Sequence, residues 1–108
     1  MISLKKTVKV FVTAKGQRPY RDWLERLDER TRARIEARIF RIEEGNLGDV
    51  KNLGAGVLES RIDFGPGYRV YFAFDGNEIV ILLLGGNKGS QARDIKKAQK
   101  YWAEYLED

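Results

Sequence analysis

Apolar and polar residues alternate along two stretches in the second half of the chain, residues 57–64 and 68–74. A period of two is typical of β-strands that bury one face. The GPG tripeptide at 65–67 predicts a tight turn between them. A third stretch, Ile79–Leu84, is apolar at every position, which indicates a central strand covered on both faces. The connections are too short for crossovers, so these strands form an antiparallel meander.

A different period predicts helices. Residues 28–44 show the spacing of three and four that marks an amphipathic helix, and Gly45 ends it. The apolar residues with this spacing are Ile35, Ile39 and Ile42. A shorter helix begins at Pro19, because a missing N–H costs nothing in the first helical turn, and runs to Leu27. A last helix follows Ser90, a residue type suited to capping.

These elements predict an α+β fold. The β-branched stretch Thr7–Val12 adds a strand at the start, and residues 45–56 read as a glycine-rich loop that carries Lys51. The order is then β-α-α-β-β-β-α. We expect a small, mainly antiparallel sheet that includes the first strand and packs against a helical hairpin. Residues 1–108 form a single domain on grounds of length.

The period-two pattern also predicts a cationic face. Arg61, Arg69 and Tyr71 lie on the side of the hairpin opposite the main apolar set. Lys51 precedes the first of these strands and Lys88 follows the third. Loops at the ends of neighbouring strands can bring both lysines to the same face.

Such a face suits phosphodiester cleavage in RNA. The 2′-OH supplies the nucleophile, and the protein neutralises charge on the phosphate oxygens. Arg binds a phosphate in a bidentate manner, Lys can exchange a proton, and Tyr can stack on a base. The competing interpretation is structural: Arg61 pairs with Glu59 or Asp63 and only solvates the sheet, while Tyr71 is an ordinary strand aromatic.

Composition narrows the chemistry. The chain has no His and no Cys, and its net charge of +4 comes from a basic excess in the first half, which favours an anionic partner. The acidic residues are scattered, so we expect no metal site and no cofactor. No apolar run reaches the roughly 20 residues that cross a bilayer. No signal-peptide pattern opens the sequence, so we expect a cytoplasmic protein without membrane contact.

The stretches VKNLGAGVLESRIDFGPGYRVYF and LLLGGNKGSQARDIKKA resemble the RelE/ParE superfamily of type II toxins. More narrowly, they resemble the HigB-like group often described as addiction module killer proteins. The resemblance covers about residues 19 to 105, and the strand, helical hairpin and sheet of that family agree with the predicted order. It implies a ribosome-dependent mRNA endonuclease that halts translation when its antitoxin is lost.

The resemblance also implies roles for single residues. Carried over as catalytic are Arg61, Arg69 and Lys88. Lys51 and Gln91 are carried over as RNA-binding, and we predict that Tyr71 and Arg93 bind RNA as well. Well-studied nucleases of the superfamily place a Tyr or His in the C-terminal segment, where this chain has Asp94 and Ile95. The proton transfers then fall to Tyr71, to Asp94 or to a ribosomal group.

Two alternatives stay open on the same fold. A ParE-like chain would inhibit DNA gyrase without nuclease chemistry, and the arginine-rich face of residues 28–44 would then matter more than the sheet. An inactive relative would fold and bind its antitoxin only. In each case the family implies a cognate antitoxin, of helix-turn-helix type, and the nuclease hypothesis adds the ribosome and mRNA as partners.

Overall fold

The helices and strands follow the predicted order, with one strand added. The structure, a computed structural model, describes residues 5–107; the ends of the predicted single domain, residues 1–4 and 108, lie outside the described residues. The elements are β1 Thr7–Val10, α1 Pro19–Glu25, α2 Glu29–Glu43, β2 Val50–Gly54, β3 Val57–Ile62, β4 Tyr68–Asp75, β5 Ile79–Asn87, the 3₁₀ helix η1 Lys88–Ser90 and α3 Gln91–Glu107.

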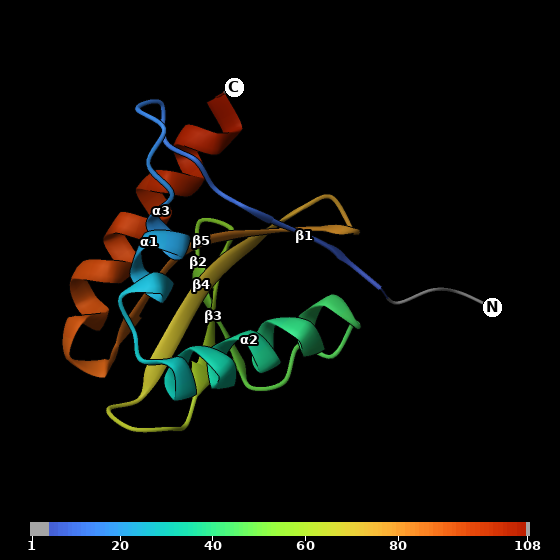
Figure 1. Cartoon of the computed structure of the whole chain (residues 1–108). Coiled ribbons are helices and arrows are strands. Elements are labelled where there is room, and N and C mark those ends of the chain that lie inside the picture. Colours follow the sequence, from blue (N-terminus) through green and yellow to red (C-terminus); the bar gives the residue numbers. More distant parts are fainter. Residues whose placement is uncertain (1–4, 108) are drawn as a thin grey trace.

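All five strands belong to one mixed sheet with the order β1-β5-β4-β3-β2 (Figure 1). Strands β2 to β5 pair antiparallel, as the predicted meander requires. β1 lies at the edge and runs parallel to β5, which is possible because α1 and α2 separate the two halves of the chain. The prediction that the first strand joins the same sheet is confirmed, and so is the α+β class.

Helices cover both faces of the sheet. The helical hairpin α1–α2 packs on one face through Tyr20, Leu24, Ile35 and Ile42. α3 packs on the other face through Ala98 and Trp102 (Figure 1). β5 contributes alternate residues to the two cores, Val80 and Leu82 to the first, Ile81 and Leu83 to the second. The prediction that Ile79–Leu84 forms a central strand buried on both sides is therefore confirmed.

The segment expected to be a glycine-rich loop contains β2. Val50 pairs with Ser60 and Lys51 with Glu59, so this short strand extends the sheet beyond β3. It is an edge strand with three exposed residues out of five, Lys51, Asn52 and Gly54. Its sequence therefore lacks the apolar alternation that marks a half-buried strand.

β5 is longer than its apolar run. Gly85, Gly86 and Asn87, which follow the apolar run, continue pairing with β4. A Cβ atom at Gly85 would collide with the ring of Trp23, and one at Gly86 would collide with the carboxylate of Asp94. The two glycines thus let α1 and α3 approach the strand closely.

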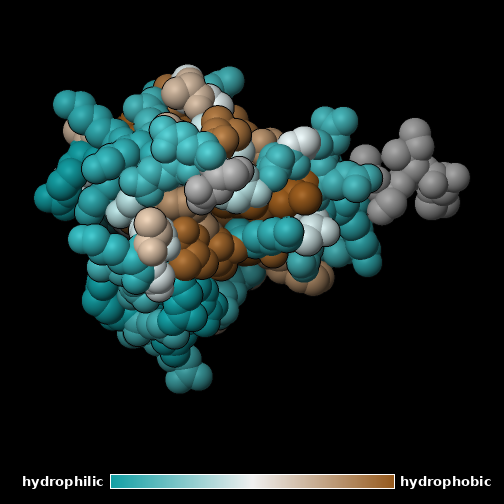
Figure 2. Space-filling view, turned by 90° about the horizontal axis from the view of Figure 1, so that it is seen from above, coloured by the Kyte–Doolittle hydropathy of each residue, from teal (hydrophilic) through white to brown (hydrophobic). Residues whose placement is uncertain are grey.

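Hydrophilic side chains cover most of the face seen in Figure 2, and apolar side chains gather in a hollow near its centre. Among the described residues, the large apolar side chains that stay exposed are Val12, Phe40 and Leu106. No helix in the described range is long and apolar enough to cross a membrane.

Candidate functional site

Three neighbouring strands bring the predicted basic residues to one face of the sheet. Arg61 lies opposite Arg69, and Glu59 lies opposite Tyr71, in the register of β3 and β4. β2 places Lys51 opposite Glu59. Residues directly opposite each other on antiparallel strands share a face. The predicted common face of Arg61, Arg69 and Tyr71 is therefore present, and Lys51 joins it from a strand rather than from a loop.

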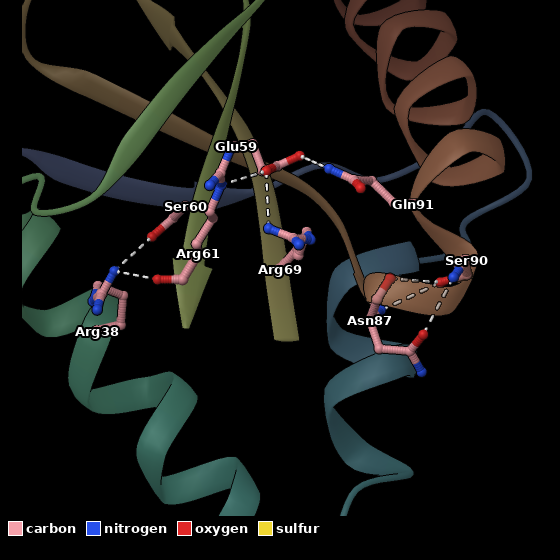
Figure 3. Close-up of polar contacts among 8 residues, drawn as sticks. All are labelled: Arg38, Glu59, Ser60, Arg61, Arg69, Asn87, Ser90 and Gln91. Carbon is pink, nitrogen blue, oxygen red and sulfur yellow. Dashed lines mark hydrogen bonds and ion pairs between the residues drawn. The ribbon is translucent and has the colours of Figure 1, made fainter. Parts of the chain in front are cut away.

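A buried carboxylate organises this face. Glu59 has no exposed surface. Its Oε1 accepts hydrogen bonds from Arg61 Nε at 3.2 Å and from Arg69 Nη1 at 3.1 Å, and its Oε2 accepts one from Gln91 Nε2 at 2.9 Å (Figure 3). We call Glu59, Arg61, Arg69 and Gln91 the Glu59 cluster. A buried charge is tolerated when it is paired and hydrogen-bonded in this way.

The two arginines of the Glu59 cluster differ in exposure. The side chain of Arg61 is 42% exposed, whereas that of Arg69 is 12% exposed. Within residues 5–107, the side chain of Arg61 bonds through Nε only, so its two Nη nitrogens remain available. Arg69 directs Nη1 at Glu59, and its own Nε is buried without a partner in the described chain. Arg61 can therefore present its guanidinium to a ligand, and Arg69 mainly neutralises Glu59.

The backbone at Arg61 is held from two further elements. Arg38 of α2 donates from Nη1 to the Arg61 carbonyl at 2.7 Å and to Ser60 Oγ at 3.3 Å (Figure 3). The Arg61 N–H donates to the carbonyl of Asp49, just before β2, at 3.2 Å. Arg38 is half-buried, and its contacts fix the strand position from which Arg61 projects.

Contrary to expectation, Tyr71 is not in a position to present its ring to RNA. It is fully buried in the core beneath α3, because this helix covers the same sheet face a few residues away from Arg61. Its hydroxyl has no hydrogen-bond partner among the described residues. Burial, together with the nearby carboxylates of Glu59 and Asp94, raises the pKa of the Tyr71 phenol. We therefore leave Tyr71 out of the candidate site.

The remaining predicted residues are spread over three places. Gln91 belongs to the Glu59 cluster. Lys88 is exposed in η1, next to the GPG turn, where a Cβ on Gly67 would lie 3.6 Å from Lys88 Cβ. Arg93 lines a separate cleft between α1 and α3. Asp94, considered for proton transfer, is 7% exposed, accepts a hydrogen bond from Ser90 Oγ and lines that same cleft.

The sequence pattern placed Glu59 beside the arginines but treated it only as a structural partner. That structural interpretation is confirmed for the Arg61–Glu59 pair, while the described residues give no ion pair between Arg61 and Asp63. The sequence signal for a central Glu59 was its place in the alternation, between the core residue Val57 and Arg61. Alternation alone does not predict its hydrogen bond to Gln91, because Gln91 comes from α3, distant in the sequence.

The chemistry open to this face is electrostatic. In the described part of the chain, no group of acidic side chains is arranged to hold a metal ion. Arg61 offers a planar pair of donors, and Lys51 offers an exposed ammonium on the adjacent strand. Such groups bind a phosphate or a carboxylate.

Comparison with known proteins decides the family. A family model described as "Phage derived protein Gp49-like (DUF891)" matches residues 22–103. The chain belongs to this family. The Gp49-like family is a RelE/ParE-like, toxin-type family of toxin–antitoxin systems, so membership implies an antitoxin partner.

A relative in Haemophilus influenzae, described as an uncharacterized protein, is 49% identical over 78 residues. The match covers 71% of this chain and 79% of the relative.

The residues matched to the Gp49-like family, 22–103, include the whole Glu59 cluster, Lys51 and Lys88.

Proposed function

We propose that this chain is a HigB-like toxin that cuts mRNA on the ribosome and thereby stops translation. The observation that carries the proposal is the state of Arg61. Glu59 holds the Arg61 guanidinium through Nε, while the side chain stays 42% exposed. Neither Nη nitrogen has a partner among the described residues, so both are available to a phosphate. A guanidinium held in one orientation loses little freedom when it binds, which favours charge stabilisation in a transition state.

In the proposed reaction, the 2′ oxygen of a ribose attacks the adjacent phosphorus and the bond to the 5′ oxygen breaks. The products are a 2′,3′-cyclic phosphate and a 5′-hydroxyl end. Arg61 binds the non-bridging oxygens, where charge develops. Lys51, exposed on β2, binds a neighbouring phosphate of the strand. Arg69 and Gln91 act through Glu59, because their bonds to its carboxylate keep Arg61 in place.

Two protons must move in this reaction. Lys88, exposed beside the GPG turn, donates the proton that the leaving 5′ oxygen requires. The proton of the 2′-OH needs an acceptor. Tyr71 is buried and Asp94 lines a different cleft, so the ribosome supplies this group. The proposed activity therefore depends on the ribosome.

Cleavage of a short mRNA, measured with purified programmed ribosomes and without them, tests the proposal. We expect cleavage only with ribosomes, and we expect Arg61→Ala to lower its rate about 100-fold. Arg30→Ala removes an exposed arginine of α2 and serves as the matched control; it should cleave like the wild type. Cleavage by Arg61→Ala at the wild-type rate, or no cleavage by the wild type, would contradict the proposal.

A further inference from the structure

A second polar cleft lies between α1 and α3, outside the Glu59 cluster. Its volume is about 520 Å³, within the roughly 300–1,000 Å³ range of ligand pockets. Gly85 and Gly86 of β5 are among its lining residues. No member of the Glu59 cluster lines it. Arg93, which we predicted to bind RNA, lines this cleft and is not part of the Glu59 cluster.

Three cations line the cleft without a partner in the described chain. They are Arg26, just after α1, together with Arg93 and Lys97, one turn apart on α3. The other arginines of this region are different: Arg18 and Arg21 lie 3.7 and 3.8 Å from the carboxylate of Glu25. Unpaired cations that converge on a hollow attract an anion.

Aromatic rings line the same cleft. Trp23 lies against Gly85, where a side chain on the glycine would displace it. Tyr101 lines the cleft from α3, and its ring packs against Phe11 with centroids 5.2 Å apart. Both rings are half-buried. Flat, supported rings next to cations are the surfaces on which proteins stack the bases of single-stranded nucleic acids.

Two carboxylates complete the lining of the cleft. They help to distinguish a nucleotide from an acidic peptide as its ligand. Asp22 accepts a hydrogen bond from the Arg18 N–H, and Asp94 accepts one from Ser90 Oγ. Each carboxylate has further lone pairs for a donor. An acidic peptide offers carboxylates to the cations, but it has no flat base that could stack on the aromatic rings and donate to Asp22 and Asp94. A nucleotide offers a phosphate to the cations, a ring to the aromatic side chains, and amino or hydroxyl donors to the carboxylates.

We propose that the α1–α3 cleft binds one nucleotide of a single-stranded RNA, outside the site of cleavage. The start of α3 joins the two places, since Gln91 bonds to Glu59 while Ser90 and Arg93 line the cleft. A strand lying on Arg61 then continues past Lys88 and over this helix end into the cleft. The inference rests on the proposed function for the choice of RNA as the strand.

Binding of a fluorescent single-stranded 12-nucleotide RNA, followed by anisotropy without ribosomes, tests this cleft. We expect the triple variant R26Q/R93Q/K97Q to bind at least tenfold more weakly. The slope of log K against log salt concentration should be less steep by about 0.7 for each phosphate that the variant no longer neutralises. The control R30Q/K96Q/K100Q removes the same charge from exposed positions outside the cleft and should bind less than threefold more weakly. Equal weakening in both variants would overturn the inference.

A second measurement reads the cleft directly. Trp23 lines the cleft, whereas Trp102 of α3 is buried against the sheet, so their indole N–H signals in an NMR spectrum report two different places. Adding adenosine monophosphate should shift the Trp23 signal and leave that of Trp102 in place. An unmoved Trp23 signal, or an equal shift with a glutamate-rich peptide, would overturn the assignment to a nucleotide.

These measurements also separate the inference from the proposed function. Neither uses ribosomes or cleavage. Cleft-dependent binding by a protein that cuts no mRNA would refute the proposed nuclease and support the cleft. Ribosome-dependent cleavage by a protein whose RNA binding ignores the cleft variants would support the nuclease and refute the cleft.

Discussion

Arg61 and Arg69 occupy equivalent positions in the sequence alternation, but they differ in how far they are exposed to solvent. Arg61 and Arg69 face each other across β3 and β4 and bond to the same oxygen of Glu59. Only 12% of the Arg69 side chain is exposed, against 42% of Arg61. Because Glu59 is fully buried, its charge depends most on the partner that is shielded from water. We infer that Arg69 stabilises the fold and that Arg61 serves a ligand.

The variant Arg69→Ala tests this division of roles. Removing one partner of a buried ion pair leaves an uncompensated charge, so we expect the free energy of unfolding to fall by about 3 kcal/mol. Arg61→Ala, at the more exposed position, should cost less than about 1 kcal/mol. Urea denaturation measures both values.

The double variant Glu59→Gln/Arg69→Ala serves as the control. It removes the buried charge together with its partner, so it should recover part of the stability that Arg69→Ala removes. Equal unfolding free energies for Arg69→Ala and the wild type would contradict a structural role of Arg69.

Among helices and strands, β2 and its turn show what a sequence pattern misses. Val57 pairs with Gly54, so Ala55 and Gly56 form a two-residue hairpin loop. Both have positive φ, 55° and 86°, as a type I′ turn requires. Ala55 is the only described residue other than glycine with positive φ. Asn or Gly at this position would have predicted the hairpin, and with it β2.

Replacing Ala55 should therefore stabilise the hairpin. A left-handed backbone is unfavourable for Ala and readily adopted by Asn, so Ala55→Asn should raise the free energy of unfolding by about 0.5–1 kcal/mol. Ala14→Asn is the matched control, because Ala14 is also exposed in a turn but has no positive φ. Thermal unfolding followed by circular dichroism compares them. A gain of the same size at Ala14 would show that strain at Ala55 is not the cause.

The ends of the strands were harder to predict than their existence. β3, β4 and the apolar part of β5 follow from alternation and from an unbroken apolar run. The extension of β5 through Gly85 and Gly86 does not, because glycine disfavours strands. Both glycines are explained only by Trp23 and Asp94, which arrive from other helices.

The whole molecule places one buried tyrosine in each core. Tyr20 of α1 packs between the helical hairpin and the sheet, and Tyr71 of β4 packs beneath α3, with 3% and 0% of their surface exposed. Burial is the main cause that raises the pKa of both phenols. A phenol that keeps its proton in the folded state and loses it in the unfolded state stabilises the fold below its unfolded pKa. That stability is lost as the pH rises above it.

We therefore expect the free energy of unfolding to fall above pH 10, the ordinary pKa of tyrosine, by about 1.4 kcal/mol per pH unit for each such phenol. Tyr71→Phe should remove the part of this slope that the Tyr71 phenol contributes. At neutral pH it should not lower stability, because the Tyr71 hydroxyl has no partner among the described residues. Urea denaturation between pH 8 and about 11.5 measures the slopes. Tyr68→Phe, a half-buried position on the same strand, is the control. An unchanged slope in Tyr71→Phe would contradict this account.

The sequence by itself determined the fold class, the order of most elements and the common face of Arg61 and Arg69, because side-chain periods of two and of three to four depend on local backbone geometry alone. Tertiary structure decided which residues on that face meet solvent. α3 covers Tyr71 and brings Gln91 to Glu59, and it carries Arg93 to a cleft with α1. Alternation assigns a residue to a face of a sheet, but only the packing of a helix from elsewhere in the chain decides which part of that face stays open.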